Sequence, residues 1–137
     1  MNAVDTNILI YVHDPRDPRK QRIASELVVD LTDGLLLWQV VCEFLSASRK
    51  LAPFGYDFGQ AGDDVRKLMT QWTTALPSWR VLDRAILLLG RHSLAYWDAL
   101  IIAACLEADV HTLYSEDLGG HHEIDGLRII NPFLSAK

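Results

Sequence analysis

Residues 94–104 have the sequence LAYWDALIIAA, an apolar run that one carboxylate, Asp98, interrupts. Wound as a helix, this run is apolar on nearly every face, which is typical of a helix buried inside a domain. Asp98 falls where the chain enters the helix, so it can act as an N-cap or first-turn residue for free backbone N–H groups. It can instead belong to a functional site, provided that other parts of the chain supply further carboxylates.

The composition suits one globular domain over residues 1–137. Half of the 137 residues are hydrophobic and 23% are charged, and a chain of this size buries about two-thirds of its unfolded surface. The N-terminus has no basic region ahead of an apolar core, and no apolar run reaches the ~18 residues of a membrane span. We therefore expect a soluble, cytoplasmic protein with no membrane association. Cys42 and Cys105 lie in apolar helical patterns, where a thiol acts as a small buried hydrophobe rather than a nucleophile or a disulfide partner.

The formal net charge is −5. This acidity argues against a protein that holds nucleic acid by its overall charge, because such proteins are usually basic. It does not exclude an enzyme that acts on nucleic acid, since local basic groups and a divalent cation can bring phosphate to an acidic site. Arg16, Arg19, Lys20 and Arg22 form one basic cluster, which is either a solvated helix face or a contact for RNA or a partner.

Strand and helix patterns alternate along the chain. Short apolar runs predict strands over residues 3–4, 35–38, 77–82, 111–114 and 124–130, and helical spacing predicts helices over 8–12, 19–31, 39–47, 60–74, 83–93 and 94–108, with a loop at 52–59. Such alternation indicates an α/β fold with a largely parallel sheet. Right-handed crossovers would then gather the strand ends at one edge.

Two further acids follow predicted strands. Asp5 comes directly after Ala3–Val4, and Asp117 follows the strand at 111–114. In open parallel sheets, the carboxyl ends of the strands face the ligand crevice. Asp5 can also serve as the N-cap of the next helix, and the hydroxyl of Ser115 can orient Asp117 by a hydrogen bond.

Glu43 lies in the middle of the predicted helix at 39–47. Val40, Phe44 and Ala47 flank it at three- and four-residue spacing, so its neighbours on the helix surface are apolar. An unpaired buried carboxylate destabilises a fold by several kcal/mol. Because a mid-helix acid has no capping role, Glu43 either faces solvent or meets a cation.

Asp5, Glu43, Asp98 and Asp117 can all reach one crevice in such a fold. Four converging carboxylates would repel one another unless cations occupied the site, and an all-oxygen ligand set favours Mg²⁺ or Mn²⁺ over zinc. A site of this kind can bind a metal-activated water and stabilise charge on a phosphodiester, as in nucleases. The sequence has no Gly-x-Ser-x-Gly elbow, phosphate-binding glycine-rich loop or reactive Cys–His pairing.

Five segments in order carry a family resemblance. They are Val4–Leu9, Gln39–Phe44, Tyr96–Ile101, Leu113–Leu118 and the closing Gly126–Phe133. Together they resemble a PIN domain of the VapC type over nearly the whole chain.

The resemblance implies a three-layer α/β/α sandwich around a mostly parallel sheet. It also implies a Mg²⁺- or Mn²⁺-dependent endoribonuclease that is the toxin of a type II toxin–antitoxin pair, forms a homodimer and is silenced by an antitoxin whose tail blocks the acidic site. By motif, the acidic quartet matches Asp5, Glu43, Asp98 and Asp117, with Thr6, Asn7 and Ser115 as supporting polar residues. Glu116 lies beside Asp117 and could replace it as a ligand.

Two other functions remain open from the sequence. One is a non-catalytic PIN-like protein-binding module, in which the acids are helix caps or dock a basic peptide. The other is a phosphoacceptor receiver, which also places acids at strand ends of an α/β fold. The receiver hypothesis lacks a lysine near the last strands, where only Arg128 is basic.

Overall fold

A six-stranded sheet forms the centre of the computed structural model, which describes residues 1–118 and 120–134. The strand order is β3-β2-β1-β4-β6-β5, and only β5 runs antiparallel to its neighbour. The strands are β1 (Asn2–Val4), β2 (Gly34–Leu37), β3 (Thr73–Ala75), β4 (Thr112–Tyr114), β5 (Glu123–Ile124) and β6 (Leu127–Ile130). Ala3 of β1 pairs with Leu35 on one side and Leu113 on the other, so β1 is a central strand.

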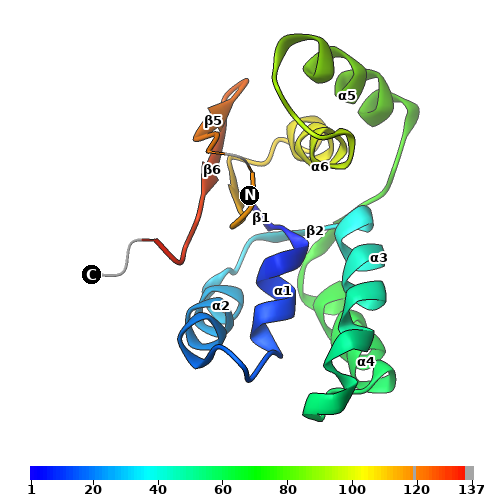
Figure 1. Ribbon diagram of the computed structural model, residues 1–137. Coiled ribbons are helices and arrows are strands. Elements are labelled where there is room, and N and C mark those ends of the chain that lie inside the picture. The colour runs from blue at the N-terminus through cyan, green and yellow to red at the C-terminus, as the bar shows by residue number, and fades with distance from the viewer. Residues whose placement is uncertain (119, 135–137) are drawn as a thin grey trace.

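Helices cover both faces of this sheet (Figure 1). One face carries α1 (Thr6–Val12), α2 (Pro18–Asp30), α3 (Trp38–Ala47), the 3₁₀ segment η1 (Ser48–Phe54) and α4 (Phe58–Gln71), and the other carries α5 (Trp79–Arg91) and α6 (Tyr96–Glu107). The three-layer α/β/α sandwich predicted from the motifs is therefore confirmed. Among the described residues, no helix has the length and apolarity needed to cross a membrane.

The core lies on both sides of the central strands. Leu36, Leu113 and Ile8 are fully buried or nearly so, and α6 buries Ile102 and Cys105 against the opposite face of the sheet. The apolar run at 94–104 is thus a buried helix, as its pattern predicts. Cys42, in contrast, is exposed, so the prediction of a buried thiol was right for Cys105 and wrong for Cys42.

The topology reverses direction at β1. From β1 the chain proceeds to β2 and then β3 on one side, and afterwards it returns to β4 on the other side of β1. Ligands of open α/β sheets bind outside the carboxyl ends of the strands at such a switch point. Asp5 directly follows β1 and Ser115 directly follows β4, so both lie at this point.

After residue 70, the end of one predicted helix and the position of one predicted strand differ from the structure. The helix predicted to Thr74 ends at Gln71, and the third strand is Thr73–Ala75 rather than 77–82. Residues 79–82 are helical because the Ser78 hydroxyl accepts a hydrogen bond from the backbone N–H of Val81 at 3.2 Å and so caps the start of α5.

Other boundaries also differ from the prediction. The expected strand at 124–130 is a hairpin of β5 and β6, because Asp125 and Gly126 adopt φ angles of 50° and 92° and reverse the chain between them. The loop expected at 52–59 is shorter, since η1 runs to Phe54 and α4 begins at Phe58. Asp57 and Gln60 form a capping box there.

Gly34 offers a test of how α4 is attached to the sheet. A Cβ at this position would overlap the indole ring of Trp72, which is buried and donates through Nε1 to the carbonyl of Leu31 at 3.2 Å. We expect Gly34→Ala to lower the free energy of unfolding by about 1–3 kcal/mol, as overpacked substitutions do. Urea denaturation measures this change.

Gly90 is the matched control, because it lies on α5 with open space where a Cβ would be. Gly90→Ala should stabilise the protein by about 0.5–1 kcal/mol through helix propensity. Equal effects of the two substitutions would contradict the packing described for Gly34.

Candidate active site

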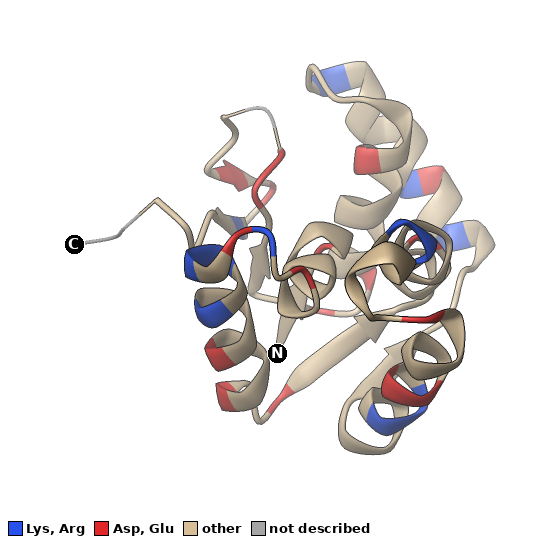
Figure 2. Ribbon diagram, turned by 60° about the horizontal axis from the view of Figure 1, so that its bottom comes forward, with Lys and Arg blue, Asp and Glu red and all other residues tan. Residues whose placement is uncertain are grey.

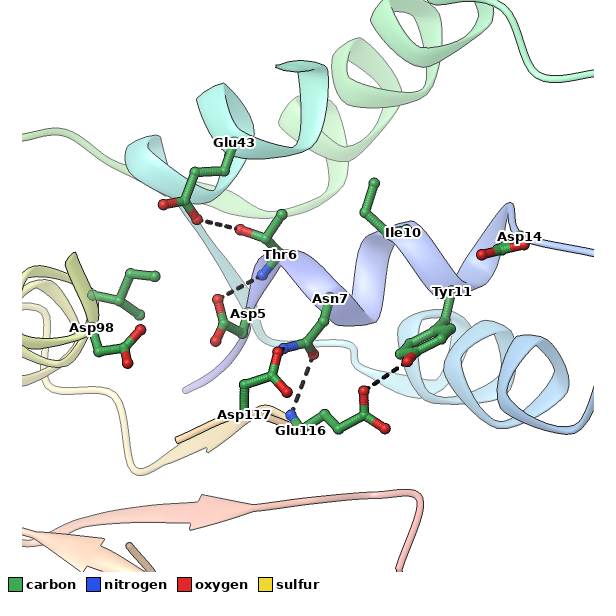
Figure 3. A pocket seen from close by; sticks show the side chains of 11 residues that line it. Asp5, Thr6, Asn7, Ile10, Tyr11, Asp14, Glu43, Asp98, Glu116 and Asp117 are labelled. Atoms are coloured by element: carbon green, nitrogen blue, oxygen red, sulfur yellow. Dashed lines mark hydrogen bonds between the residues drawn. The ribbon is translucent and has the colours of Figure 1, made fainter. Parts of the chain in front are cut away.

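A pocket of about 420 Å³ opens at the carboxyl ends of β1 and β4 (Figure 3). Its eleven described lining residues include six Asp or Glu and no Lys or Arg. These residues are Asp5, Thr6, Asn7, Ile10, Tyr11, Asp14, Glu43, Asp98, Ile101, Glu116 and Asp117. We call this the acidic pocket. It brings together all four of the acids that the sequence singles out.

Asp5 is the most buried of the four predicted acids, with 6% of its surface exposed. Its Oδ1 accepts a hydrogen bond from the backbone N–H of Thr6 at 2.7 Å, and its Oδ2 accepts one from the hydroxyl of Ser115 at 2.7 Å. Asp5 is therefore both the N-cap of α1 and a wall of the acidic pocket. The capping and site interpretations of this residue do not exclude each other.

Glu43 enters the pocket from α3 and is half-buried. Thr6 donates through Oγ1 to Glu43 Oε1 at 2.6 Å, and Gln39 donates through Nε2 to Glu43 Oε2 at 2.9 Å. The same amide of Gln39 lies 3.2 Å from the carbonyl oxygen of Trp97. Gln39 thereby connects α3 to the start of α6, where Asp98 lies.

Asp98 lies in the first turn of α6. The N-cap of this helix is Ala95, and among the described residues no side chain makes a capping hydrogen bond there. Asp98 is therefore a first-turn residue, as one of the two sequence interpretations expects, but not a hydrogen-bonding cap. Its carboxylate also lines the acidic pocket.

Asp117 is the most solvent-exposed of the quartet and follows β4. Asn7 donates through Nδ2 to Asp117 Oδ2 at 3.2 Å. The backbone N–H of Asp117 donates to the Ser115 hydroxyl oxygen at 3.2 Å. The same Ser115 hydroxyl donates to Asp5, so one serine orders both strand-end acids.

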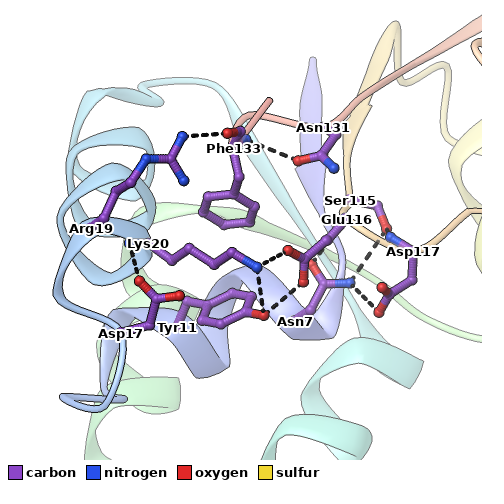
Figure 4. A network of polar contacts seen from close by, with 10 residues as sticks. All are labelled: Asn7, Tyr11, Asp17, Arg19, Lys20, Ser115, Glu116, Asp117, Asn131 and Phe133. Carbon is purple, nitrogen blue, oxygen red and sulfur yellow. Dashed lines mark hydrogen bonds and ion pairs between the residues drawn. The ribbon is translucent and has the colours of Figure 1, made fainter. Parts of the chain in front are cut away.

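Glu116 also lines the acidic pocket, but cationic and phenolic donors hold its carboxylate (Figure 4). Tyr11 donates its hydroxyl to Oε1 at 2.7 Å, and the Lys20 ammonium pairs with Oε2. Asp14 is occupied in a comparable way, because Arg16 donates to both of its oxygens at 2.9 Å. These two acids are thus neutralised at the edge of the pocket.

Burial and mutual repulsion raise the pKa of two pocket acids. The pKa of Asp5 is raised first by desolvation and then by the charges of Glu43 and Asp98, although the hydrogen bonds from Ser115 and Thr6 oppose this shift. The pKa of Asp98 is raised by desolvation and by the charges of Glu43 and Asp117. Among the described residues that line the pocket, no lysine or arginine opposes these shifts.

The donor set fits a hard divalent cation in chemistry and charge. Carboxylate oxygens are the ligands that Mg²⁺ and Mn²⁺ prefer, and the uncompensated charge at Asp5 and Asp98 would be neutralised by such an ion. Within the described part of the chain, no three His, Cys, Asp or Glu side chains are arranged so that they could hold a metal ion. The fit therefore rests on the chemistry of the acids that line the pocket.

Several residues of this network were not predicted from the sequence as site residues. Gln39 shares a helix face with Glu43 at four-residue spacing, a signal that was present in the sequence. Tyr11 and Lys20 reach Glu116 across 105 and 96 residues of chain, and no local pattern indicates such a pairing.

Comparison with known proteins places the chain in a family. The sequence matches the PIN domain family over residues 3–127. The chain belongs to the PIN domain family. This confirms the resemblance read from the motifs. No curated protein matches the sequence.

Solved structures share this PIN fold at low identity. A toxin–antitoxin complex from Klebsiella pneumoniae gives a TM-score of 0.70 at 17% identity, covering 96% of this chain and 98% of that one. VapC20 of Mycobacterium tuberculosis, described as a sarcin–ricin loop cleaving toxin, gives a TM-score of 0.68 at 18% identity, covering 88% of this chain and 92% of that one. VapBC2 from Rickettsia felis, bound to a promoter DNA fragment, gives a TM-score of 0.64 at 15% identity, covering 95% of this chain and 97% of that one. At these identities the likeness concerns the fold.

The raised pKa of Asp98 predicts that its charge destabilises the metal-free protein. Because the folded-state pKa lies above the unfolded value, the penalty is absent below about pH 4 and grows as the pH rises through the folded pKa. Asp98→Asn should therefore raise the Tm of the metal-free protein at pH 7 by about 3 °C. Scanning calorimetry at pH 7 and at pH 3.5 measures the difference.

Glu26→Gln is the control, since it removes one negative charge from the exposed face of α2, outside the acidic pocket. It should leave the Tm nearly unchanged at both pH values. A lower Tm for Asp98→Asn at pH 7 would contradict the repulsion argument.

Proposed function

We propose that this PIN-family chain is a divalent-metal-dependent endoribonuclease and the toxin of a type II toxin–antitoxin pair. The observation that carries the proposal is the acidic pocket itself, where acids from four separate segments meet at the switch point of the sheet without a lysine or arginine among the described lining residues. Pockets of this charge suit phosphodiester chemistry only when a hard cation is present.

The pocket residues divide into ligands and supports in this proposal. Asp5, Asp98 and Asp117 would hold Mg²⁺ or Mn²⁺, and Glu43 would position the metal or the attacking water. When bound, the metal lowers the pKa of water and stabilises charge on the phosphate. Thr6, Asn7 and Ser115 hold the acids by their hydrogen bonds, which reduces the motion of the carboxylates at the reacting phosphate.

RNA is the proposed substrate, and a cognate antitoxin is the proposed partner. VapC20 is described as cleaving the sarcin–ricin loop, and other structures of this fold are toxin–antitoxin complexes. An antitoxin segment that enters the acidic pocket would need basic side chains, since the pocket's described lining has no cation of its own. The toxin would act on RNA in the cytoplasm.

A homodimer is supported by one uncharged surface, whose described lining includes Gln39. Two neighbouring grooves share Pro77, Val81 and Leu100 and have no charged residue in their described lining. We call this the apolar face. Its exposed large side chains are Trp38, Leu76, Trp79 and Trp97.

The apolar face suits a second copy of this chain. Its four large side chains expose roughly 500 Å², given about 150–250 Å² for a whole aromatic side chain, which is over half of the ~800 Å² per partner of a stable interface. Two copies with a net charge of −5 repel each other, so an uncharged surface is where they can meet.

The first test of the proposed function is cleavage of a mixed RNA pool by the purified protein with Mg²⁺, with Mn²⁺ or with EDTA. We expect cleavage with either metal and none with EDTA. Asp5→Asn and Asp98→Asn should each lower the rate at least 100-fold, because each removes a proposed ligand charge.

Glu26→Gln controls for the loss of one negative charge and for contaminating nucleases, and it should cleave like the wild type. Full activity in both pocket variants would refute the proposal. Metal-independent binding of a protein partner, with no RNA cleavage and no growth arrest on expression, would favour the non-catalytic binding module instead.

The proposed dimer has its own test. Trp79 is 81% exposed at the first position of α5, so Trp79→Glu should leave the fold intact and place a charge within the proposed contact. Light scattering coupled to gel filtration should give a dimer for the wild type and a monomer for the variant. Val29→Glu, at an equally exposed site on α2, should remain dimeric. A monomeric wild type would contradict the proposed dimer.

A further inference from the structure

The Glu116 carboxylate sits in a polar network at the edge of the acidic pocket, next to the proposed ligand Asp117 (Figure 4). Both of its oxygens are engaged, one by the Tyr11 hydroxyl at 2.7 Å and one by the Lys20 ammonium. Lys20 Nζ also donates to the Tyr11 hydroxyl oxygen at 3.3 Å. The three side chains therefore form a closed triangle of hydrogen bonds.

Lys20 occupies an unfavourable place on its own helix. It lies in the first turn of α2, and Figure 2 shows the basic residues of α2 near its N-terminus and the acidic ones near its C-terminus. This is the reverse of what the helix dipole favours, since cations destabilise a helix N-terminus by a few tenths of a kcal/mol to about 1 kcal/mol. The negative charge of Glu116, paired with Lys20 at this end of α2, compensates for the unfavourable interaction of the lysine with the helix dipole.

The surroundings make this ion pair more than a surface contact. The side chains of Lys20 and Glu116 are only 25% and 20% exposed. The ammonium lies 4.9 Å from the ring centre of Tyr11 and 5.5 Å from that of Phe133, and those two rings meet edge to face at 5.1 Å. Arg19 holds the same segment by donating to the Phe133 carbonyl at 2.5 Å.

The network continues from Glu116 to Asp117. The backbone N–H of Glu116 donates to Asn7 Oδ1 at 3.3 Å, and the amide of Asn7 donates to Asp117 Oδ2 at 3.2 Å. Fixing the Glu116 side chain therefore fixes the backbone that aligns Asn7 with Asp117. The pKa of Tyr11 is raised by burial and by Glu116, so its hydroxyl remains a donor at neutral pH.

We propose that Lys20 and Tyr11 are positioning residues, which hold Glu116 as a neutralised acid outside the metal-ligand set and thereby keep Asn7 and Asp117 aligned for catalysis. The inference rests on the proposed nuclease function. It assigns the ligand role to Asp117 rather than Glu116, and it gives the basic N-terminus of α2 an internal role in place of RNA contact.

The test compares Lys20→Met, Glu116→Gln and the double variant with the wild type. Methionine keeps the aliphatic stem but removes the charge, so a free carboxylate remains at Glu116 in the single variant. We expect kcat for RNA cleavage to fall about tenfold in Lys20→Met with KM nearly unchanged, a loss of about 1.4 kcal/mol of transition-state stabilisation. The double variant should recover most of the activity, because its neutral amide no longer needs a cation.

Two measurements without RNA separate this inference from the nuclease proposal. Calorimetric titration of the metal-free proteins with Mn²⁺ should show severalfold tighter binding for Lys20→Met, since Glu116 becomes available as a ligand, and wild-type affinity for the double variant. In NMR spectra of the metal-free proteins, the side-chain amide signal of Asn7 should shift or broaden in Lys20→Met and return in the double variant.

Arg22→Met is the matched control, because it removes a positive charge from an exposed position two residues further along α2. It should match the wild type in all three measurements. Tyr11→Phe, which keeps the ring, should resemble Lys20→Met with a smaller effect, and this second variant covers the case in which Lys20→Met fails to fold.

Two results would overturn the inference. A rise in KM with unchanged kcat in Lys20→Met, not rescued by Glu116→Gln, would show that Lys20 contacts RNA. An unchanged Asn7 signal in Lys20→Met would show that the network does not position the loop, whether or not the wild type cleaves RNA. The wild type could also fail to cleave RNA while the Asn7 signal and the Mn²⁺ affinity of the variants change as expected. That result would refute the nuclease function but keep the positioning roles of Lys20 and Tyr11.

Discussion

Repulsion between the carboxylates of the acidic pocket is the constraint on which the surrounding structure depends. Asp5 and Asp98 have raised pKa values because the pocket desolvates them and places them beside other acids. A stable fold would ordinarily separate such charges or pair them with cations. Here the sheet topology brings them together, since β1 and β4 are neighbours whose connections diverge at their carboxyl ends.

Neutral hydrogen-bond donors make this arrangement tolerable, and charged partners are kept at its edge. Thr6, Ser115 and Gln39 donate to Asp5 or Glu43 without neutralising them. Lys20, in contrast, neutralises Glu116 at the rim of the pocket. The central acids thus have no cationic partner in the described lining of the pocket, while the ion pair with Lys20 removes Glu116 from competition for a bound cation. Stability favours pairing each acid with a cation, whereas the proposed chemistry needs the central acids unpaired. The cationic side chains therefore lie at the rim of the pocket and not at its centre.

The four central acids could be predicted from the sequence, but several of the residues that hydrogen-bond to the pocket acids could not. Asp5 and Asp117 could be located because each follows a short apolar strand, and Glu43 because a mid-helix acid among apolar neighbours needs an explanation. The strand Thr73–Ala75 was missed because a three-residue edge strand has no apolar run. The hairpin turn at Asp125-Gly126 was readable, since Asp-Gly favours this turn, yet the flanking apolar residues suggested one strand. The pairing of Lys20 with Glu116 spans 96 residues and depends on tertiary structure.

A crystal structure of the wild-type protein soaked in Mn²⁺ tests the central claim most directly, because anomalous scattering identifies manganese without reference to activity. The account predicts an anomalous peak in the acidic pocket, within about 2.0–2.4 Å of carboxylate oxygens of Asp5 and Asp98, with Glu116 still paired to Lys20. No peak in the pocket at millimolar Mn²⁺, or a peak bound by Glu116 with Lys20 displaced, would contradict it.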